Sequence, residues 1–125
     1  MLSKSPNETF KAAAHLVVTG RKRKYPDVKI ILAHLGGTTP ILAPRVAVLS
    51  YHMGCSLNPE EIMRDFQTFY YETALSGYDT NLAAMEKFVS PDRIIFGTDF
   101  PGKKCRLHDR KRWKLINGRH EKQSA

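Results

Sequence analysis

Two short apolar segments each end in a side chain that can move protons or bind a metal ion. The first, KIILAHLGG (residues 29–37), ends in His34 followed by two glycines. The second, RIIFGTDFP (residues 93–101), ends in Asp99. An imidazole and a carboxylate held together can act as acid and base, or they can share a divalent metal ion. Two such junctions in one chain predict a site built where parallel strands end.

A third apolar segment, TFYYETA (residues 68–74), also ends in polar side chains, Glu72 and Thr73. In α/β barrels and open parallel sheets, the carboxyl ends of the strands line a concave mouth where ligands bind. The glycines after His34 are expected to let a substrate or a metal-bound water come close. The residues alone also allow a simpler interpretation, in which His34 is a hydrogen-bonded structural residue and Asp99 caps a turn.

The segments between these junctions alternate between helical and strand-like patterns. Short β-branched or aromatic runs predict strands, and apolar residues at helical spacing between caps and glycines predict helices. SPNE, which begins at Ser5, and NPEE, which begins at Asn58, both have the form of a capping box with proline in the first turn. The expected helices are 5–20, 41–54, 58–66 and 81–89, and the expected strands are 28–33, 68–74 and 93–96. This alternation predicts an α/β fold with parallel strands and right-handed crossovers.

Three details of this pattern carry further expectations. The strand 28–33 is apolar throughout and is expected to be buried on both faces. The segment RKRKYPD (residues 21–27) is expected to be a polar connection with solvated charges. Pro44 is expected to break or kink the first turn of the helix 41–54.

The positive charge of the chain is concentrated at one end. The formal charge of the 125 residues is +8, but residues 102–125 contain nine Lys and Arg against two acidic residues, so the first 101 residues carry only about +1. The body of the chain therefore has no electrostatic reason to bind nucleic acid. Residues 102–125 show no caps and no helical register, and they are predicted to form a disordered or irregular basic tail.

The remaining composition places the chain among cytoplasmic proteins. Cys55 and Cys105 do not have a C-x-x-C spacing and are expected to be free thiols in a reducing compartment. No apolar run is long enough to cross a membrane, and the first residues do not have the apolar core of a signal peptide.

Three motifs in order resemble one family: YPDVKIILAHLGGTTPILAPR, FYYETALSG and RIIFGTDFP. Together they resemble the amidohydrolase-related superfamily, and within it the decarboxylase branch, which contains aminocarboxymuconate-semialdehyde decarboxylase and the fungal 6-methylsalicylate and γ-resorcylate decarboxylases. The resemblance covers residues 6–101. It implies a (β/α)8 TIM barrel with one divalent metal ion, commonly zinc or manganese. This chain would supply about strands six to eight of that barrel. Residues 1–101 would then be a partial barrel domain, and residues 102–125 a tail unlike the family.

The resemblance also assigns residues to roles. It implies that His34 handles protons beside the metal and that Asp99 is a metal ligand. Arg45 matches an arginine on the helix after the histidine motif, where it would bind substrate or pair with a nearby carboxylate or helix end. The family's first-strand H-x-H pair and fifth-strand histidine have no match, because both lie before the covered region, and His15 lies in a helix that precedes the sixth-strand segment. In a separate departure from the family, Glu72 stands where aspartate is more common.

The implied activity is a metal-dependent, non-oxidative decarboxylation of an aromatic or unsaturated carboxylic acid. The alternatives are a metal-dependent hydrolase of a lactone, ester or amide, and a non-catalytic remnant in which only the basic tail binds anything. The implied partners are a small carboxylic acid and a second copy of the chain in a homodimer. Because the family's other metal ligands lie outside the matched region, the isolated chain is expected to lack a complete active site.

Overall fold

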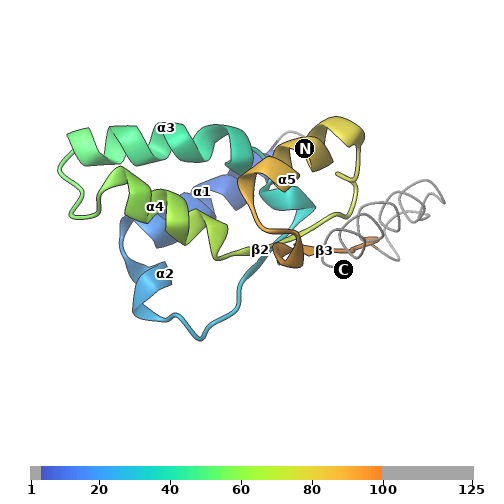
Figure 1. The fold of residues 1–125 in the computed structure, drawn as a ribbon, viewed down its shortest axis with the longest axis horizontal. Coiled ribbons are helices and arrows are strands. Elements are labelled where there is room, and N and C mark those ends of the chain that lie inside the picture. Colours follow the sequence, from blue (N-terminus) through green and yellow to red (C-terminus); the bar gives the residue numbers. More distant parts are fainter. Residues whose placement is uncertain (1–3, 100–125) are drawn as a thin grey trace, which may run out of the picture.

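The computed structural model describes residues 4–99, with side chains from Pro6 onward. Five α-helices and three short strands follow one another in the alternating order that the sequence predicts (Figure 1). The elements are α1 (Lys4–Val18), α2 (Arg21–Lys24), β1 (Ile31–Leu32), η1 (His34–Gly36), α3 (Thr39–His52), α4 (Pro59–Gln67), β2 (Tyr70–Glu72), α5 (Asp79–Phe88), η2 (Pro91–Arg93) and β3 (Ile94–Ile95).

The three strands form one parallel sheet in the order β1-β2-β3. Leu32 pairs with Tyr71, and Tyr71 pairs with Ile94, so these three side chains point to the same face of the sheet. All three are buried. Consecutive parallel neighbours joined through helices are the arrangement of a barrel segment, and the predicted α/β fold class is confirmed.

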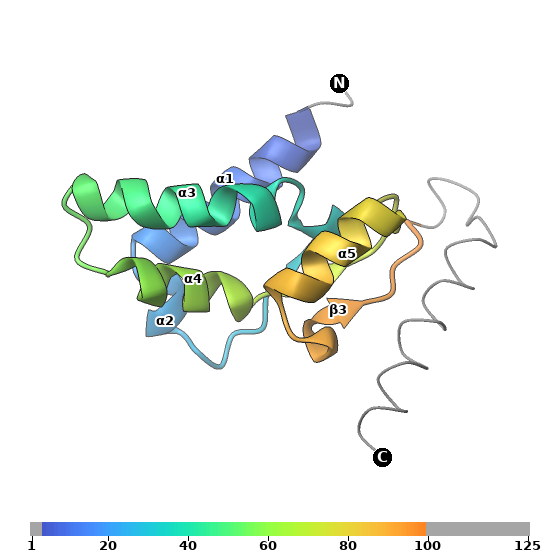
Figure 2. The ribbon, with the colours of Figure 1, turned by 45° about the horizontal axis from the view of Figure 1, so that its top comes forward.

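The helices supply the other half of the core. Figure 1 shows α1, α3, α4 and α5 on one side of the strands, and Figure 2 shows α5 beside β3. Val17, Ile62, Phe66 and Met85 are fully buried among them. Burying side chains of this size contributes roughly 1.5–3 kcal/mol each. The single core therefore lies between the helices and one face of the sheet.

The expectation that the first strand is buried on both faces is wrong. Leu32 is 6% exposed, whereas its neighbour Ile31 is 57% exposed. Successive residues of a strand point to opposite faces, and within residues 4–99 the helices cover only one of them. The strand is also shorter than predicted, because only residues 31 and 32 pair with β2.

The predicted start of α4 is confirmed in detail. The Asn58 side chain accepts a hydrogen bond from the Glu61 backbone N–H at 2.8 Å, and the Glu61 carboxylate accepts one from the Asn58 N–H at 2.9 Å. This is the reciprocal capping box. The prediction that Ser5 is the N-cap of α1 is wrong, because the helix already begins at Lys4 and includes Ser5. Gly20 follows that helix with φ 72°, as a residue that ends a helix should.

Two other local expectations differ from the structure. Pro44 does not break α3, which runs without interruption from Thr39 to His52, although proline at this position has no N–H to donate to the Pro40 carbonyl. The polar connection 21–27 contains the short helix α2, and its charges are not all solvated, since Lys22 is only 6% exposed. The predicted basic tail, 102–125, lies outside the described residues. No helix of the described part is both long and apolar enough to span a membrane.

Candidate active site

The turn after β1 has an unusual backbone. Four consecutive residues, His34 to Gly37, have φ between 53° and 69°, in the left-handed region. This region costs an L-residue about 1–2 kcal/mol, and glycine is the usual occupant. His34 and Leu35 therefore need interactions from outside the turn to hold them there. A non-glycine residue held in this region by its surroundings is a common feature of functional sites.

Contacts on both sides of the turn hold it in place. The His34 backbone N–H donates to Glu72 Oε1 at 2.7 Å, and the Leu35 side chain is 2% exposed in the core. Thr39 Oγ1 donates to the Gly36 carbonyl at 2.5 Å. The turn is thus tied to the sheet on one side and to α3 on the other.

A further hydrogen bond orients the imidazole ring of His34. His34 Nδ1 lies 2.7 Å from the carbonyl oxygen of Ala74. A carbonyl oxygen only accepts hydrogen bonds, so Nδ1 carries the proton and the lone pair of the neutral ring is on Nε2. The side chain is 24% exposed, which leaves the ring within reach of a small molecule. His34 is therefore a hydrogen-bonded residue whose second ring nitrogen, Nε2, is left without a hydrogen-bond partner among the described residues.

Glu72 holds the site together through backbone contacts. Its second oxygen, Oε2, accepts from the Ala74 N–H at 2.8 Å, and Oε1 lies 3.8 Å from His34 Nδ1. The carboxylate therefore bridges the ends of β1 and β2. Gly97, after β3, packs so closely against Glu72 Oε2 that a Cβ at this position would collide with it. The carboxyl ends of all three strands meet at this one carboxylate.

The two glycines of the turn have a packing role that the sequence analysis did not assign to them. A Cβ on Gly36 would lie 2.7 Å from the Tyr71 ring, and a Cβ on Gly37 would collide with the backbone of Pro6 in α1. Real side chains do not adopt such contacts. These glycines bring the turn against the sheet and α1 rather than opening room for a ligand.

The other two predicted site residues are less constrained. Asp99 follows β3 with φ 58° and is exposed, and Arg45 is exposed on α3. Within residues 4–99, no hydrogen bond or ion pair joins either of them to His34. Their roles as metal ligand and substrate-binding residue stay predictions.

The described residues alone do not fit a metal ion. Within residues 4–99, no three His, Cys, Asp or Glu side chains come together as ligands. His34 Nδ1 and both Glu72 oxygens are already engaged by protein groups, so they are poor candidates. A mononuclear site needs three or four protein ligands, and Asp99 with His34 Nε2 would supply two at most.

Sequence reasoning missed the role of Glu72. Its place at a strand end was visible, but its bonds reach His34, 38 residues away, and depend on the register of β1 against β2. The one available signal was that three strand ends each carry a polar residue. The contact of Gly97 with Glu72 had no local signal at all.

Comparison with known proteins shows the family of this chain. The model of the amidohydrolase family matches residues 3–118, most of the sequence. This chain belongs to the amidohydrolase family. The match runs past residue 101, so the boundary between a barrel part and a tail at that position remains a prediction.

Its curated relatives are decarboxylases. Decarboxylase macB of Penicillium terrestre is 43% identical over 100 residues, which are 77% of this chain and 30% of the relative. The 6-methylsalicylic acid decarboxylase of Penicillium expansum is 41% identical over 98 residues, again 77% of this chain and 30% of the relative. This chain thus spans less than a third of the length of these relatives.

Solved structures agree with the fold. A dihydroxybenzoic acid decarboxylase from Polaromonas, with bound manganese and the inhibitor 2-nitroresorcinol, superposes with a TM-score of 0.70 at 25% identity, covering 92% of this chain and 40% of that one. The 5-carboxyvanillate decarboxylase of Sphingomonas paucimobilis superposes with a TM-score of 0.66 at 19% identity, covering 80% and 31%. The predicted resemblance to decarboxylases of this superfamily, as part of a TIM barrel, is confirmed.

Proposed function

We propose that this chain carries the proton-handling end of a non-oxidative decarboxylase that acts on an aromatic carboxylic acid. The observation that supports it best is the hydrogen bond from His34 Nδ1 to the Ala74 carbonyl, which leaves Nε2 as the basic nitrogen of the ring. The curated relatives at 41% and 43% identity are decarboxylases, and one of them acts on 6-methylsalicylic acid. We take that acid as the first substrate to test.

The chemistry needs one proton for each carbon dioxide released. A proton adds to the ring carbon that bears the carboxylate, the bond between this carbon and the carboxylate breaks, and carbon dioxide leaves while the ring recovers its aromatic electrons. His34 would first take up a proton from solvent at Nε2 and would then donate this proton to the ring carbon, which returns the imidazole to its neutral form with the lone pair on Nε2. A well-placed general acid contributes roughly 10²–10⁴-fold to such a step. The Ala74 carbonyl holds the ring at Nδ1, and the Glu72 carboxylate holds the backbone N–H of the same residue.

The metal remains a separate part of the proposal. In the resembled family a zinc or manganese ion would supply positive charge for the carboxylate, and Asp99 would be one of its ligands. Because the described residues do not complete such a site, no step above depends on it. Arg45 as a substrate-binding residue, a homodimer and a cytoplasmic location also remain predictions from the sequence.

A chimera would test the role of His34 in a complete barrel. Residues 3–99 of this chain would replace the matching segment of the Penicillium expansum decarboxylase, and carbon dioxide release from 6-methylsalicylate would be measured. We expect an active chimera, and a loss of about 10²-fold or more in kcat for His34→Gln. The matched control is His15→Gln, since His15 is exposed on α1 and should leave kcat unchanged.

Three outcomes would overturn the proposal. A folded chimera that releases no carbon dioxide would indicate a non-catalytic remnant. A chimera that cleaves a lactone, ester or amide instead would indicate a hydrolase. Full activity of the His34→Gln chimera would remove His34 from the chemistry. The chain itself, assayed beside the chimera with added manganese, shows whether this part acts alone.

A further inference from the structure

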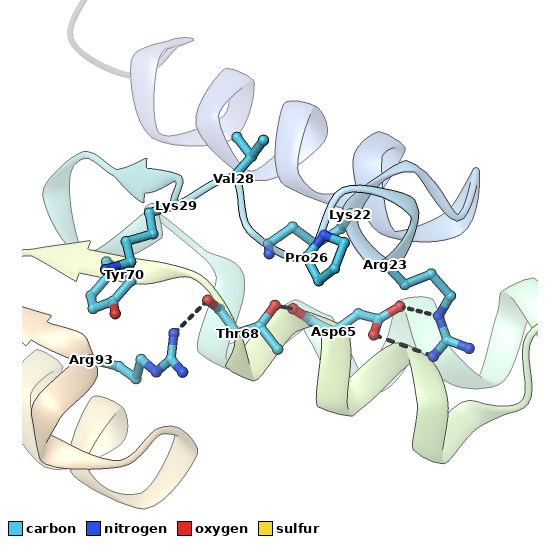
Figure 3. Close-up of a pocket in the computed structure, with 9 residues that line it drawn as sticks. All are labelled: Lys22, Arg23, Pro26, Val28, Lys29, Asp65, Thr68, Tyr70 and Arg93. Carbon is cyan, nitrogen blue, oxygen red and sulfur yellow. Dashed lines mark hydrogen bonds and ion pairs between the residues drawn. The ribbon is translucent and has the colours of Figure 1, made fainter.

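A pocket lies at the opposite end of the sheet from His34. Its volume is ≈ 330 Å³. Lys29 comes just before β1, Tyr70 begins β2, and Arg93 comes just before β3, so the pocket lies at the amino ends of the strands. Figure 3 shows the residues that line it: Lys22, Arg23, Pro26, Val28, Lys29, Asp65, Thr68, Tyr70 and Arg93.

The charges around this pocket are strongly positive. Four lining side chains are cationic and one, Asp65, is acidic, so their formal charge is +3. Arg23 holds both oxygens of Asp65, with distances of 2.9 Å from Nε and 3.2 Å from Nη2. The Asp65 carboxylate is therefore already neutralised by Arg23. The other three cations, Lys22, Lys29 and Arg93, have no acidic partner on the pocket wall.

Lys22 is the most informative of these cations. It is 94% buried, although lysine is almost never buried without a partner. Its ammonium lies 5.5 Å from the centre of the Phe69 ring, and within the described residues it forms no ion pair. A ring face compensates only part of the cost of removing an ammonium ion from water. A buried cation facing a pocket is therefore expected to receive an anion there.

Arg93 and Lys29 complete the positive wall. The Arg93 guanidinium stacks on the Tyr70 ring at 4.8 Å and donates from Nη1 to the Thr68 carbonyl at 2.9 Å. These contacts fix its plane and leave its other N–H groups for a ligand. In Figure 3, Lys29 lies on the other side of Tyr70 from Arg93. Pro26 and Val28 add apolar surface to the same pocket.

We propose that this pocket binds the phosphate group of a small phosphate ester, with the phosphate beside the buried ammonium of Lys22, with Lys29 and Arg93 on the surrounding wall, and with the organic part against Pro26 and Val28. Phosphate suits a pocket wall of ammonium and guanidinium donors, because it carries up to two charges and accepts several hydrogen bonds. The volume is near the lower limit of small-molecule sites, larger than a lone phosphate needs. The site is separate from the proposed decarboxylase chemistry and does not depend on it.

The test is calorimetric titration of the full 125-residue chain with two probes, phenyl phosphate and inorganic phosphate. We expect phenyl phosphate to bind to one site per chain, and its affinity to fall about tenfold or more in Lys22→Met and in Lys29→Met. The matched control is Lys24→Met, which removes an exposed lysine from the same helix as Lys22 but outside the pocket. This control should keep the affinity of the unmodified chain.

The variants separate this site from non-specific binding to the basic residues 102–125. An equal loss in Lys22→Met, Lys29→Met and Lys24→Met, or binding that none of them weakens, would overturn the proposal, as would no binding of either probe. Equal affinity for both probes would show that the pocket binds free phosphate, and it would overturn the proposal that the ligand is a phosphate ester. Lys29 is exposed, so Lys29→Met should fold even if the buried Lys22→Met change does not.

Discussion

At the scale of single residues, the candidate active site depends on a strained turn held by one carboxylate. His34 and Leu35 adopt φ of 54° and 53°, which costs L-residues about 1–2 kcal/mol each. Glu72 accepts the His34 N–H at 2.7 Å and the Ala74 N–H at 2.8 Å. Hydrogen bonds to a charged group contribute roughly 1.5–3 kcal/mol, enough to offset the strain of the turn.

Glu72→Gln should therefore destabilise the fold by about 1–3 kcal/mol, because the amide places an N–H where a backbone N–H now points. Urea unfolding at pH 7 measures this difference. Glu86→Gln is the matched control, since Glu86 is exposed on α5, and it should change stability by less than about 0.5 kcal/mol. Equal stability of the two variants would contradict the holding role of Glu72.

At the scale of elements, α2 and α4 are joined by the side chain of Arg23. Its guanidinium contacts Asp65 and also Glu61 Oε1 at 2.9 Å. Hydrogen bonding to these carboxylates, that to Asp65 first, raises the pKa of Arg23, which stays charged at every accessible pH. Glu61 also closes the capping box, so the start of α4 and its contact with α2 depend on the same carboxylate.

This double role predicts a pH dependence of stability. The hydrogen bond from the Asn58 backbone, followed by that from Arg23, lowers the pKa of Glu61 below its ordinary 4.5. A lowered folded pKa means that the unfolded chain binds the proton more tightly, so this contribution is complete above pH 4.5 and is lost as the pH falls through the folded pKa.

Glu61→Gln should therefore flatten the acid part of the stability curve, measured by urea unfolding from pH 7 downward. Glu60→Gln is the control, because Glu60 lies in the same first turn and is exposed. Its curve should keep the slope of the unmodified chain below pH 4.5. A Glu61→Gln curve parallel to that of the unmodified chain would show that this carboxylate does not couple protonation to folding.

At the scale of the whole molecule, the helices cover one face of the sheet and leave the other uncovered. Leu32 is 6% exposed and Ile31 is 57% exposed, although both lie in β1 and have side chains of the same size. In a closed barrel the second face would line the interior, packed by strands that complete the ring. The relatives are more than three times as long as the matched segment, in agreement with a barrel that extends beyond these strands.

The two neighbouring residues allow a direct test of this arrangement. Leu32→Ala should cost about 2–5 kcal/mol of folding stability, because it leaves a cavity in the core. Ile31→Ala should cost less than about 1 kcal/mol, since its side chain already meets water. Urea unfolding at low protein concentration compares them. Equal large losses would mean that something covers the second face in solution.

The sequence alone determined the features whose signals lie within a few residues. Asn58, Pro59 and Glu61 form the start of α4 with bonds that span three residues, so the prediction held. The alternation of helices and strands was also readable, as were the three motifs that resemble the decarboxylases. These features depend on local backbone preferences and spacing, which the order of residues states directly.

Only the tertiary structure decided which distant groups meet and which faces are covered. The bonds of His34 to Glu72 and Ala74 join residues about 40 positions apart, and their existence depends on strand register. The burial of Lys22 and the exposure of Ile31 depend on which elements pack over them. No residue's own identity carries that information, because burial and long-range pairing are properties of the assembled layers.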